Sequence, residues 1–216
     1  MDVVIYGAGG HGKVVADIIE KQGKYKIAGF LDDIKESGST FFGYKILGGL
    51  DYLNNKSVKN GIVAIGDNWW RYLKTKEIQR INPEFQFITA IHPSAQIGRE
   101  VTIGAGTVIM AGAIINSSST IYGNCIINTK SSIGHDSIIN DFATVAPNAT
   151  LAGGVSLGKF STLSISSTVI QNVNIGSHSV VGASSTVLKD IDSNVVAYGT
   201  PAKVIKKRHE SDVYLK

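Results

Sequence analysis

A bulky apolar residue recurs at every sixth position through nearly half of this chain. The run has seventeen positions without a break, namely Ile91, Ile97, Ile103, Ile109, Ile115, Ile121, Ile127, Ile133, Ile139, Val145, Leu151, Leu157, Leu163, Val169, Ile175, Val181 and Val187. If one residue in three were apolar, such a run would arise by chance with a probability of roughly 10⁻⁸. The repeat therefore constrains the fold more strongly than any local motif.

The fifth position of each hexad completes the pattern, because it is mostly small. Small residues there are Ala95, Thr107, Ala113, Ser119, Cys125, Ser131, Ser137, Ala143, Ala149, Ser161, Ser167, Ser179 and Ser185, while Val101, Val155 and Val173 are larger. One bulky and one small inward side chain per hexad predict short strands joined by turns and stacked as coils of a narrow prism. Glycines that follow the bulky residue, such as Gly134 and Gly158, are expected at the corners.

This pattern resembles that of the hexapeptide-repeat acyltransferases, whose left-handed parallel β-helix takes about 18 residues per coil. The resemblance covers residues 91–205 and implies five to six coils. No long insertion interrupts the period, so no catalytic loop is expected to leave the prism. The segment Gly199-Thr200-Pro201-Ala202-Lys203 is similar to the ending common in these enzymes, and a short basic helix is expected from Val204 to His209.

Residues 1–90 have a different pattern. Residues 2–6, 26–31 and 61–65 have the composition of buried strands, with helices expected after the first strand and over residues 69–80. This alternation predicts a small Rossmann-like βαβ domain with a parallel sheet, and a ligand at the carboxyl ends of its strands.

A glycine motif follows the first expected strand. Gly7, Gly9 and Gly12 satisfy G-x-G-x-x-G, and Asp32 lies twenty residues after Gly12. A nicotinamide cofactor is therefore one alternative, but a domain of this size has room for only one mononucleotide-binding half. Because amide N–H groups at a helix start attract phosphate oxygens, a single nucleotide or a nucleotide sugar fits better.

Composition and charge narrow the classes of partner and the cellular compartment that we expect for this chain. The net charge of +4 is mild, with a basic tail expected over residues 206–216, and no interleaving of basic and aromatic residues indicates nucleic-acid binding. Neither a signal peptide nor a membrane-spanning stretch is expected. The lone cysteine, Cys125, occupies a small inward position, so we expect it to pack rather than react, and a chain without disulfides suits a reducing cytoplasm.

Four segments narrow the family further. They are Tyr-Gly-Ala-Gly-Gly-His-Gly at 6–12, Leu-Asp-Asp at 31–33, Ala-Ile-Gly-Asp-Asn at 64–68 and His-Pro-Ser-Ala at 92–95. Together they resemble the sugar O- and N-acetyltransferases of the sialic-acid acetyltransferase type, which include the bacillosamine and perosamine N-acetyltransferases. The resemblance implies that the first domain binds a nucleotide sugar and that the β-helix binds acetyl-CoA.

By the same resemblance, six residues of the first domain would contact the nucleotide sugar: Gly9, Gly10, His11, Asp32, Asp33 and Gly66. For His11 the alternative is a helix-start residue without ligand contact. For Asp32 and Asp33 it is a polar turn that ends the strand. Trp69 or Trp70 could stack on a base, although we expect at least one of them to pack in the core.

His135 and Asp136 are the only histidine and adjacent acid in the repeats, and they resemble the catalytic pair of this family. Acetyl transfer to an amine needs a base, and imidazole accepts a proton near neutral pH. A carboxylate can fix the imidazole tautomer and stabilise the cation that forms. His135 is thus the candidate base and Asp136 its orienting partner; the alternative is that His135 is a solvated turn residue. With no activated Ser or Cys evident, direct transfer is expected.

One coil separates His135 from Gly153, so we expect Gly153 directly beside the imidazole. The resemblance implies that the pantetheine arm of acetyl-CoA runs near Ile165 and Ala183, and that Asn128 lies by the acceptor. Related enzymes often have a second histidine where this chain has Thr144. A threonine hydroxyl could keep the acetyl-CoA contact, but the departure puts that role in doubt.

These features predict a cytoplasmic, acetyl-CoA-dependent N-acetyltransferase that acts on an amino group, at C4, of a UDP- or dTDP-linked amino-deoxy sugar for surface-glycan synthesis. The resemblance implies a homotrimer, because acetyl-CoA lies between prisms in those enzymes. The alternatives are O-acetylation of sialic acid or another sugar, and a noncatalytic scaffold that binds nucleotide sugars. No metal is expected, because His135 and His178 are 43 residues apart, not a multiple of 18, and should not converge on zinc. The nucleotide base, the sugar stereochemistry, the choice of N or O and the oxyanion donor stay open.

Overall fold

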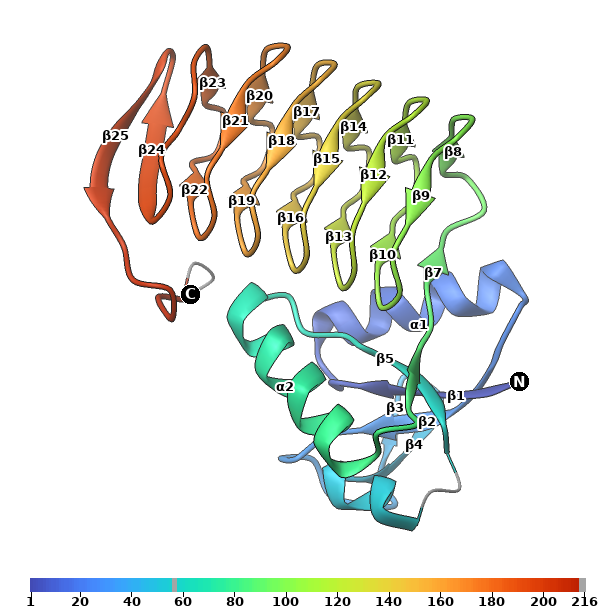
Figure 1. The fold of residues 1–216 in the computed structure, drawn as a ribbon. Helices are drawn as coiled ribbons and strands as arrows, with labels where there is room; N and C mark the ends of the chain where they lie inside the picture. The colour runs from blue at the N-terminus through green and yellow to red at the C-terminus, as the bar shows by residue number, and fades with distance from the viewer. Residues whose placement is uncertain (56–57, 214–216) are drawn as a thin grey trace.

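The computed structural model describes residues 1–55 and 58–213 and has an α/β domain beside a long prism of short strands (Figure 1). The α/β domain has one sheet in the order β3-β4-β2-β1-β5-β6. Its elements are β1 (Asp2–Tyr6), α1 (Gly10–Gln22), β2 (Lys26–Leu31), β3 (Thr40–Phe41), β4 (Tyr44–Gly48), the 3-10 helix η1 (Leu50–Asn55), β5 (Asn60–Val63), α2 (Asn68–Ile81) and β6 (Gln86–Phe87). Neighbouring strands are parallel except for β3 and β4.

The predicted strands and helices of this domain are present, with shifts of one or two residues at β5 and α2. The short strands β3, β4 and β6 and the helix η1 were not predicted. Gly12 explains the tight turn between β1 and α1, because a Cβ atom on it would lie 2.1 Å from the carbonyl oxygen of Gly7. At the start of α2, the Asp67 carboxylate accepts hydrogen bonds from the backbone of Trp69 and Trp70 at 3.0 Å.

The prism is a parallel β-helix of seventeen two-residue strands, β7 to β23, on three faces. The docking face, which the α/β domain covers, has β7 (Ala90–Ile91), β10 (Val108–Ile109), β13 (Ile126–Ile127), β16 (Thr144–Val145), β19 (Thr162–Leu163), β22 (Val180–Val181), β24 (Val195–Gly199) and β25 (Ala202–Lys207). The second face has β8 (Gln96–Ile97), β11 (Ile114–Ile115), β14 (Ser132–Ile133), β17 (Thr150–Leu151), β20 (Thr168–Val169) and β23 (Thr186–Val187). The third face has β9 (Thr102–Ile103), β12 (Thr120–Ile121), β15 (Ile138–Ile139), β18 (Ser156–Leu157) and β21 (Asn174–Ile175).

Strand pairing confirms the predicted coil length. Ile109 pairs with Ile127, and Ile127 with Val145, so each coil takes 18 residues. We call the turns after the docking, second and third faces the first, second and third corners. The regular succession of strands leaves no inserted loop between β7 and β23.

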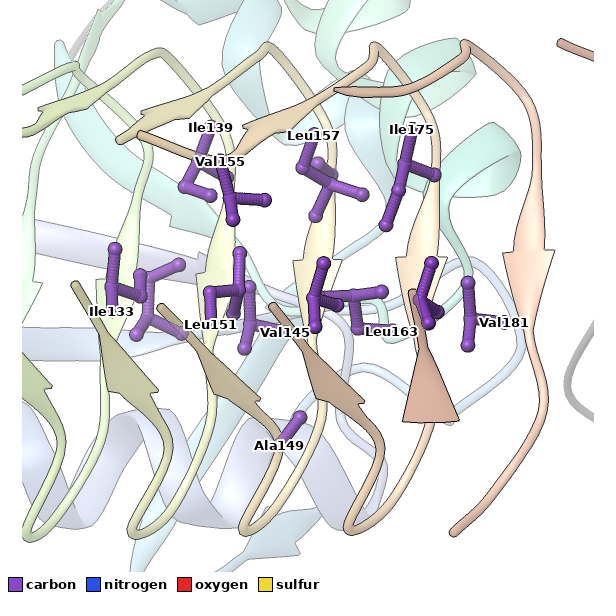
Figure 2. Packing of buried hydrophobic residues seen from close by; sticks show 14 of the residues in the cluster. Ile133, Ile139, Val145, Ala149, Leu151, Val155, Leu157, Leu163, Ile175 and Val181 are labelled. Atoms are coloured by element: carbon purple, nitrogen blue, oxygen red, sulfur yellow. The ribbon is translucent and has the colours of Figure 1, made fainter. Parts of the chain in front are cut away.

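The bulky hexad residues form the core of the prism, as Figure 2 shows for Ile133, Leu151 and Leu163. Cys125 belongs to this core and is fully buried, and burial raises the pKa of its thiol to about 12. It is therefore a packing residue, as expected. Ile97 is 40% exposed because it belongs to the first coil, which has no coil before it to cover it.

The expected corner glycines lie near the turns, but for another reason than a left-handed backbone. A Cβ atom on Gly134 would lie 2.4 Å from the carbonyl carbon of Ala152 in the next coil, so the glycine permits close stacking. The left-handed residue is the fourth of every hexad from the one that begins at Ile97 to the one that begins at Val181, such as Asp136 with φ 58° or Asn148 with φ 57°. Asn and Asp tolerate this conformation better than most residues.

The helix expected from Val204 to His209 is wrong. Residues 204–207 belong to β25, which pairs antiparallel with β24 from Gly199 and Ala202 onward, and Arg208 and His209 follow the strand. Ala197 and Ala202 are buried in the core, so the hairpin closes the end of the prism, and this burial outweighs the helical propensity of the basic residues. The expected tail boundary at residue 206 falls within β25, and residues 214–216 of that tail lie outside the described part.

Candidate functional site

The first cavity, of about 770 Å³, lies at the carboxyl ends of β1, β2 and β5. It is lined by Tyr6, Gly7, Ala8, Gly9, Gly10, His11, Asp32, Asp33, Ile34, Lys35, Ala64, Ile65, Gly66 and Lys74. All six residues predicted to bind the nucleotide sugar are among them. Gly9 is the N-cap residue of α1 and has no side chain. The first amide N–H groups of the helix are therefore not capped by a side chain.

Asp32 shapes the glycine turn. Its carboxylate accepts hydrogen bonds from the backbone of Ala8 at 2.8 Å, Ile34 at 3.0 Å and Lys35 at 3.1 Å. Partial burial opposes ionisation, but these three N–H groups prevail and lower the pKa of Asp32. The polar-turn alternative thus describes part of what Asp32 does, although the residue also lines the cavity.

Asp33 belongs to a cluster that the sequence did not reveal. Its carboxylate accepts hydrogen bonds from the Tyr6 hydroxyl at 2.6 Å and from Lys74 Nζ at 2.9 Å. Burial opposes its ionisation, yet Lys74 and Tyr6 lower the pKa of Asp33. Tyr6 ends β1 and Lys74 lies on α2, so only the folded domain brings them together.

The second cavity, of about 400 Å³, lies between the α/β domain and the docking face and reaches the first corner. It is lined by His11, Gly66, Ile126, Asn128, Thr144, Ala146, Pro147, Thr162, Ser164, Ile165 and Ala183. Four residues predicted at the acceptor or at acetyl-CoA therefore share one cavity: Asn128, Thr144, Ile165 and Ala183. His11 and Gly66 line both cavities, so the two spaces meet at these residues.

His11 has a buried ring nitrogen without a hydrogen-bond partner in the described residues at the place where the two cavities meet. This nitrogen is Nε2. Burial, helped by the positive charge of Arg71, lowers the pKa of His11 to about 4. At neutral pH the imidazole is therefore uncharged and can offer one nitrogen to a ligand as donor or acceptor.

Thr144 belongs to a buried polar network. Its hydroxyl donates to Asn68 Oδ1 at 2.6 Å, and Asn68 Nδ2 donates to Thr162 Oγ1 at 3.0 Å. Because the hydroxyl proton is engaged, Thr144 contributes mainly an apolar wall to the cavity. The expected hydrogen bond from its hydroxyl to acetyl-CoA would require this network to open.

His135 and Asp136 form a pair at the second corner. Nδ1 of His135 and Oδ2 of Asp136 are 2.7 Å apart, and both side chains are largely exposed. The backbone of Asp136 is left-handed, with φ 58°. With the proton on Nδ1, Nε2 is left with a free lone pair.

The predicted neighbour of the imidazole is confirmed. A Cβ atom on Gly153 would lie 2.5 Å from Nε2 of His135, and the N–H of Gly154 donates to the His135 carbonyl oxygen at 2.8 Å. The imidazole therefore occupies the space that a side chain at position 153 would need.

One chain does not bring the whole predicted site together. His135 and Gly153 lie at the second corner, after β14 and β17, whereas Asn128, Ile165 and Ala183 lie at the first corner. Every corner residue that lines the second cavity belongs to the first corner, and His135 is not among the lining residues. The base and the proposed acceptor pocket are therefore separated by the second face.

The third corner has a packing role. Phe142, Phe160 and His178 stack in successive coils, and Trp69 of α2 lies 5.8 Å from Phe160 between ring centroids. Trp69 is half-buried against these rings rather than in an apolar core, where we expected at least one tryptophan, and Trp70 is 50% exposed. His178 is at a different corner from His135.

Among residues 1–55 and 58–213, no group of three or more His, Cys, Asp or Glu side chains could hold a metal ion. In the same residues no helix is long and apolar enough to cross a membrane.

Comparison with known proteins agrees with this arrangement. Residues 2–91 match the family described as the PglD N-terminal domain. A Bacillus subtilis UDP-N-acetylbacillosamine N-acetyltransferase is 35% identical over 121 residues, 51% of either chain, so the match spans about half of that relative.

Solved structures match over nearly the full length. A histidine-to-asparagine variant of Caulobacter crescentus perosamine N-acetyltransferase, in complex with CoA and GDP-perosamine, is 34% identical with a TM-score of 0.90, covering 96% of this chain and 98% of that one. The acetyltransferase domain of Neisseria gonorrhoeae PglB, in complex with acetyl coenzyme A, is 31% identical with a TM-score of 0.87, covering 94% and 98%.

A nucleotide-binding-type α/β domain docked on a hexapeptide β-helix with an exposed His-Asp pair defines a hexapeptide-repeat sugar acyltransferase. Together with the near-complete match to perosamine N-acetyltransferase, this shows that the chain belongs to the PglD-like family of nucleotide-amino-sugar N-acetyltransferases.

Proposed function

We propose that this chain transfers the acetyl group of acetyl-CoA to an amino group, at C4, of a nucleotide-linked amino-deoxy sugar. The observation that carries the proposal is the meeting of two cavities at His11 and Gly66. One has helix-start amides suited to a diphosphate, and the other is a largely apolar groove suited to an acyl-pantetheine arm. A nucleotide sugar in the first cavity would extend its sugar toward the second.

In this proposal the phosphates lie against Gly9 and Gly10, and His11 contacts the sugar. Asp32, Asp33 and Gly66 surround the nucleoside. Lys74 and Tyr6, which hold Asp33, add to this wall. The relatives are named for UDP- and GDP-linked sugars, so GDP joins UDP and dTDP as a candidate nucleotide.

Acetyl-CoA would lie along the second cavity, with Ile165 and Ala183 beside the pantetheine arm and the methyl group of Thr144 in its wall. Asn128 would contact the acceptor, and Gly153 would let the His135 ring lie against the next coil beside the thioester. Ile165 is 53% exposed in the single chain, so this surface is available to a ligand or a partner.

The chemistry follows from the His135–Asp136 pair. Asp136 accepts a hydrogen bond from the Nδ1–H of His135, so Nε2 can take a proton from the amine as its nitrogen attacks the thioester carbonyl carbon. The C–S bond then breaks, the leaving thiolate takes the proton that His135 has accepted and departs as the CoA thiol, and the acetamide remains on the sugar. The lone cysteine is buried in the prism core and cannot carry an acetyl group between the two substrates, so the proposed transfer is direct.

A homotrimer would complete the site. The outward residues of the second face are uncharged, namely Gln96, Ile114, Ser132, Thr150, Thr168 and Thr186. Ile114 is 43% exposed in the single chain. Three chains packed in a ring through this face would bring the first corner of one beside the second corner of the next. His135 of one chain would then face the cavity of its neighbour.

Complementation tests this arrangement. His135→Ala and Asn128→Ala variants, each inactive or nearly so, are co-assembled in equal amounts. Random assembly should restore about a quarter of the wild-type sites if each site joins two chains. No restoration in verified mixed assemblies would show that His135 and Asn128 act within one chain. Sedimentation of Ile114→Glu, with Ile205→Glu on β25 as control, should show smaller assemblies only for Ile114→Glu.

Turnover tests the activity itself. Thiol release from acetyl-CoA is measured with UDP-, dTDP- and GDP-linked 4-amino sugars, and with sialic acid and UDP-N-acetylglucosamine as hydroxyl acceptors. Turnover with one amino sugar, lost in His135→Ala, supports the proposal and names the nucleotide. Turnover only with sialic acid would replace it by O-acetylation. Binding of nucleotide sugars without any turnover would favour the noncatalytic scaffold. We expect the reaction in the cytoplasm, where a buried, unpaired cysteine is compatible with the reducing conditions.

A further inference from the structure

Arg71 is a buried cation at the boundary between the two domains. It lies on α2, is only 1% exposed and is among the largest fully buried side chains of the chain. A buried arginine is costly unless its N–H groups are hydrogen-bonded. Its contacts therefore indicate what the fold gains from it.

The guanidinium group joins both domains through hydrogen bonds to backbone carbonyls. Within the α/β domain, Nη1 donates to the carbonyl oxygens of Ile65 and Gly66, each at 2.9 Å. On the prism, Nε donates to the Asn124 carbonyl at 2.8 Å and Nη2 to the Phe142 carbonyl at 2.9 Å. Asn124 and Phe142 occupy the same corner position in successive coils, so one side chain holds the loop after β5 against two coils.

A side-chain network extends the same connection. Nη2 of Arg71 also donates to Asn68 Oδ1 at 2.8 Å, and the same oxygen accepts a hydrogen bond from the Thr144 hydroxyl at 2.6 Å. Thr144 lines the second cavity, while Gly66 lines both cavities. Arg71 thus contacts directly the wall that the two cavities share.

We propose that Arg71 is a positioning residue that aligns the two cavities by fixing the Ile65–Gly66 loop to the prism at Asn124 and Phe142. The inference rests on the proposed function, because alignment matters when an acceptor in one cavity must meet a donor in the other. A misplacement of about 1 Å between reacting groups can cost roughly a hundredfold in rate. Five N–H donors in a rigid fork can hold several carbonyls at once, which the three donors of lysine on a flexible stem do not.

The test compares Arg71→Lys with Arg80→Lys, the same exchange on an exposed residue of α2. Arg71→Lys should lower kcat by about ten- to hundredfold, while the separately measured affinities for CoA and for the nucleotide change little. Arg80→Lys should leave all three unchanged. An unchanged kcat in folded Arg71→Lys would overturn the proposal, as would losses confined to thermal stability and binding.

Amide hydrogen exchange gives a second measurement that does not depend on turnover. In Arg71→Lys the amides of residues 64–66 should exchange about tenfold faster or more, while those of β13 keep their wild-type rates. Unchanged exchange at the loop would refute the role of Arg71, whether or not the wild-type protein acetylates any of the sugars. Absence of acetylation by the wild-type protein would by itself refute only the proposed function. If Arg71→Lys does not fold, Thr144→Val removes the hydroxyl with little change in shape and should lower kcat about three- to tenfold. An unchanged kcat in Thr144→Val would then count against the network.

Discussion

Gly153 lies one coil beyond His135, and the imidazole occupies the space that a Cβ atom on residue 153 would need. Such a Cβ atom would be 2.5 Å from Nε2 and 2.6 Å from Cε1 of His135. A glycine at this place therefore lets the basic nitrogen adopt its position beside the next coil. The lack of a side chain at position 153 thus determines where the proposed base, His135, can lie.

Gly153→Ala should displace the His135 ring and lower kcat by about ten- to hundredfold, because the base would no longer point at the same place. The melting temperature should change little, since the His135 side chain is 70% exposed and free to rotate away. Steady-state kinetics and a thermal melt on the same preparation check this. Wild-type kcat in the variant would mean that the ring position seen here is not the reactive one.

Asp136→Asn should lower kcat by about tenfold or more, because an amide no longer favours the Nδ1 proton and the cation that forms during transfer. Glu100→Gln is a matched control, since Glu100 lies at the same corner and also has a left-handed backbone, with φ 62°. Equal kcat values for Asp136→Asn and wild type would leave Asp136 as a turn residue without a role in proton transfer.

Stability should rise with pH between about 4 and 6.5 partly because of His11. Its pKa falls from 6.5 in the ordinary state to about 4 in the fold, so in this window the unfolded chain binds a proton that the folded chain does not. Acidification from pH 7 to pH 5 should therefore destabilise wild type by roughly 1–2 kcal/mol more than His11→Asn.

Urea unfolding at the two pH values measures this difference. The pKa of His178 is also lowered by burial, but His178 is present in both proteins, so its contribution cancels in the comparison. Parallel curves for wild type and His11→Asn would contradict the lowered pKa of His11.

Two kinds of corner residue should respond differently to substitution. Gly134→Ala should destabilise the fold by about 1–3 kcal/mol, because the added carbon would meet the backbone of the next coil. Asn148→Gly should be nearly neutral, whereas Asn148→Val should cost about 1–2 kcal/mol through its left-handed φ of 57°. Urea midpoints of the three variants decide; a neutral Gly134→Ala would show that the coils can move apart.

The prism was predictable because its core depends on a period that runs through the sequence. Ile109, Ile127 and Val145 stack because each is 18 residues from the next, and the same arithmetic placed Gly153 beside His135. The end of the prism was not predictable in this way. Val204 and Ile205 lie on a strand because β24 offers an edge to pair with, a partner that no local pattern reveals.

The site was predicted only in part, for a related reason. Residues at a glycine motif or within the hexads, such as His11 and Ile165, could be found from the motif or the family resemblance. Tyr6, Lys74 and Arg71 could not, because their partners lie on other elements and meet only when α2 packs on the sheet and on the prism. The hexad period alone places Asn128 and His135 at successive corners, but it does not show that the cavity lies at the first of them.

The 18-residue coil has a consequence for insertions and deletions. Removing one hexad between two residues would carry the second to a different corner, whereas removing three hexads would keep the corner and shift it by one coil. Related chains should therefore gain or lose length inside the β-helix in steps of whole coils between residues that must stay on one edge. Excess length of any other size should loop out at the turns, where it leaves the order of the corners unchanged.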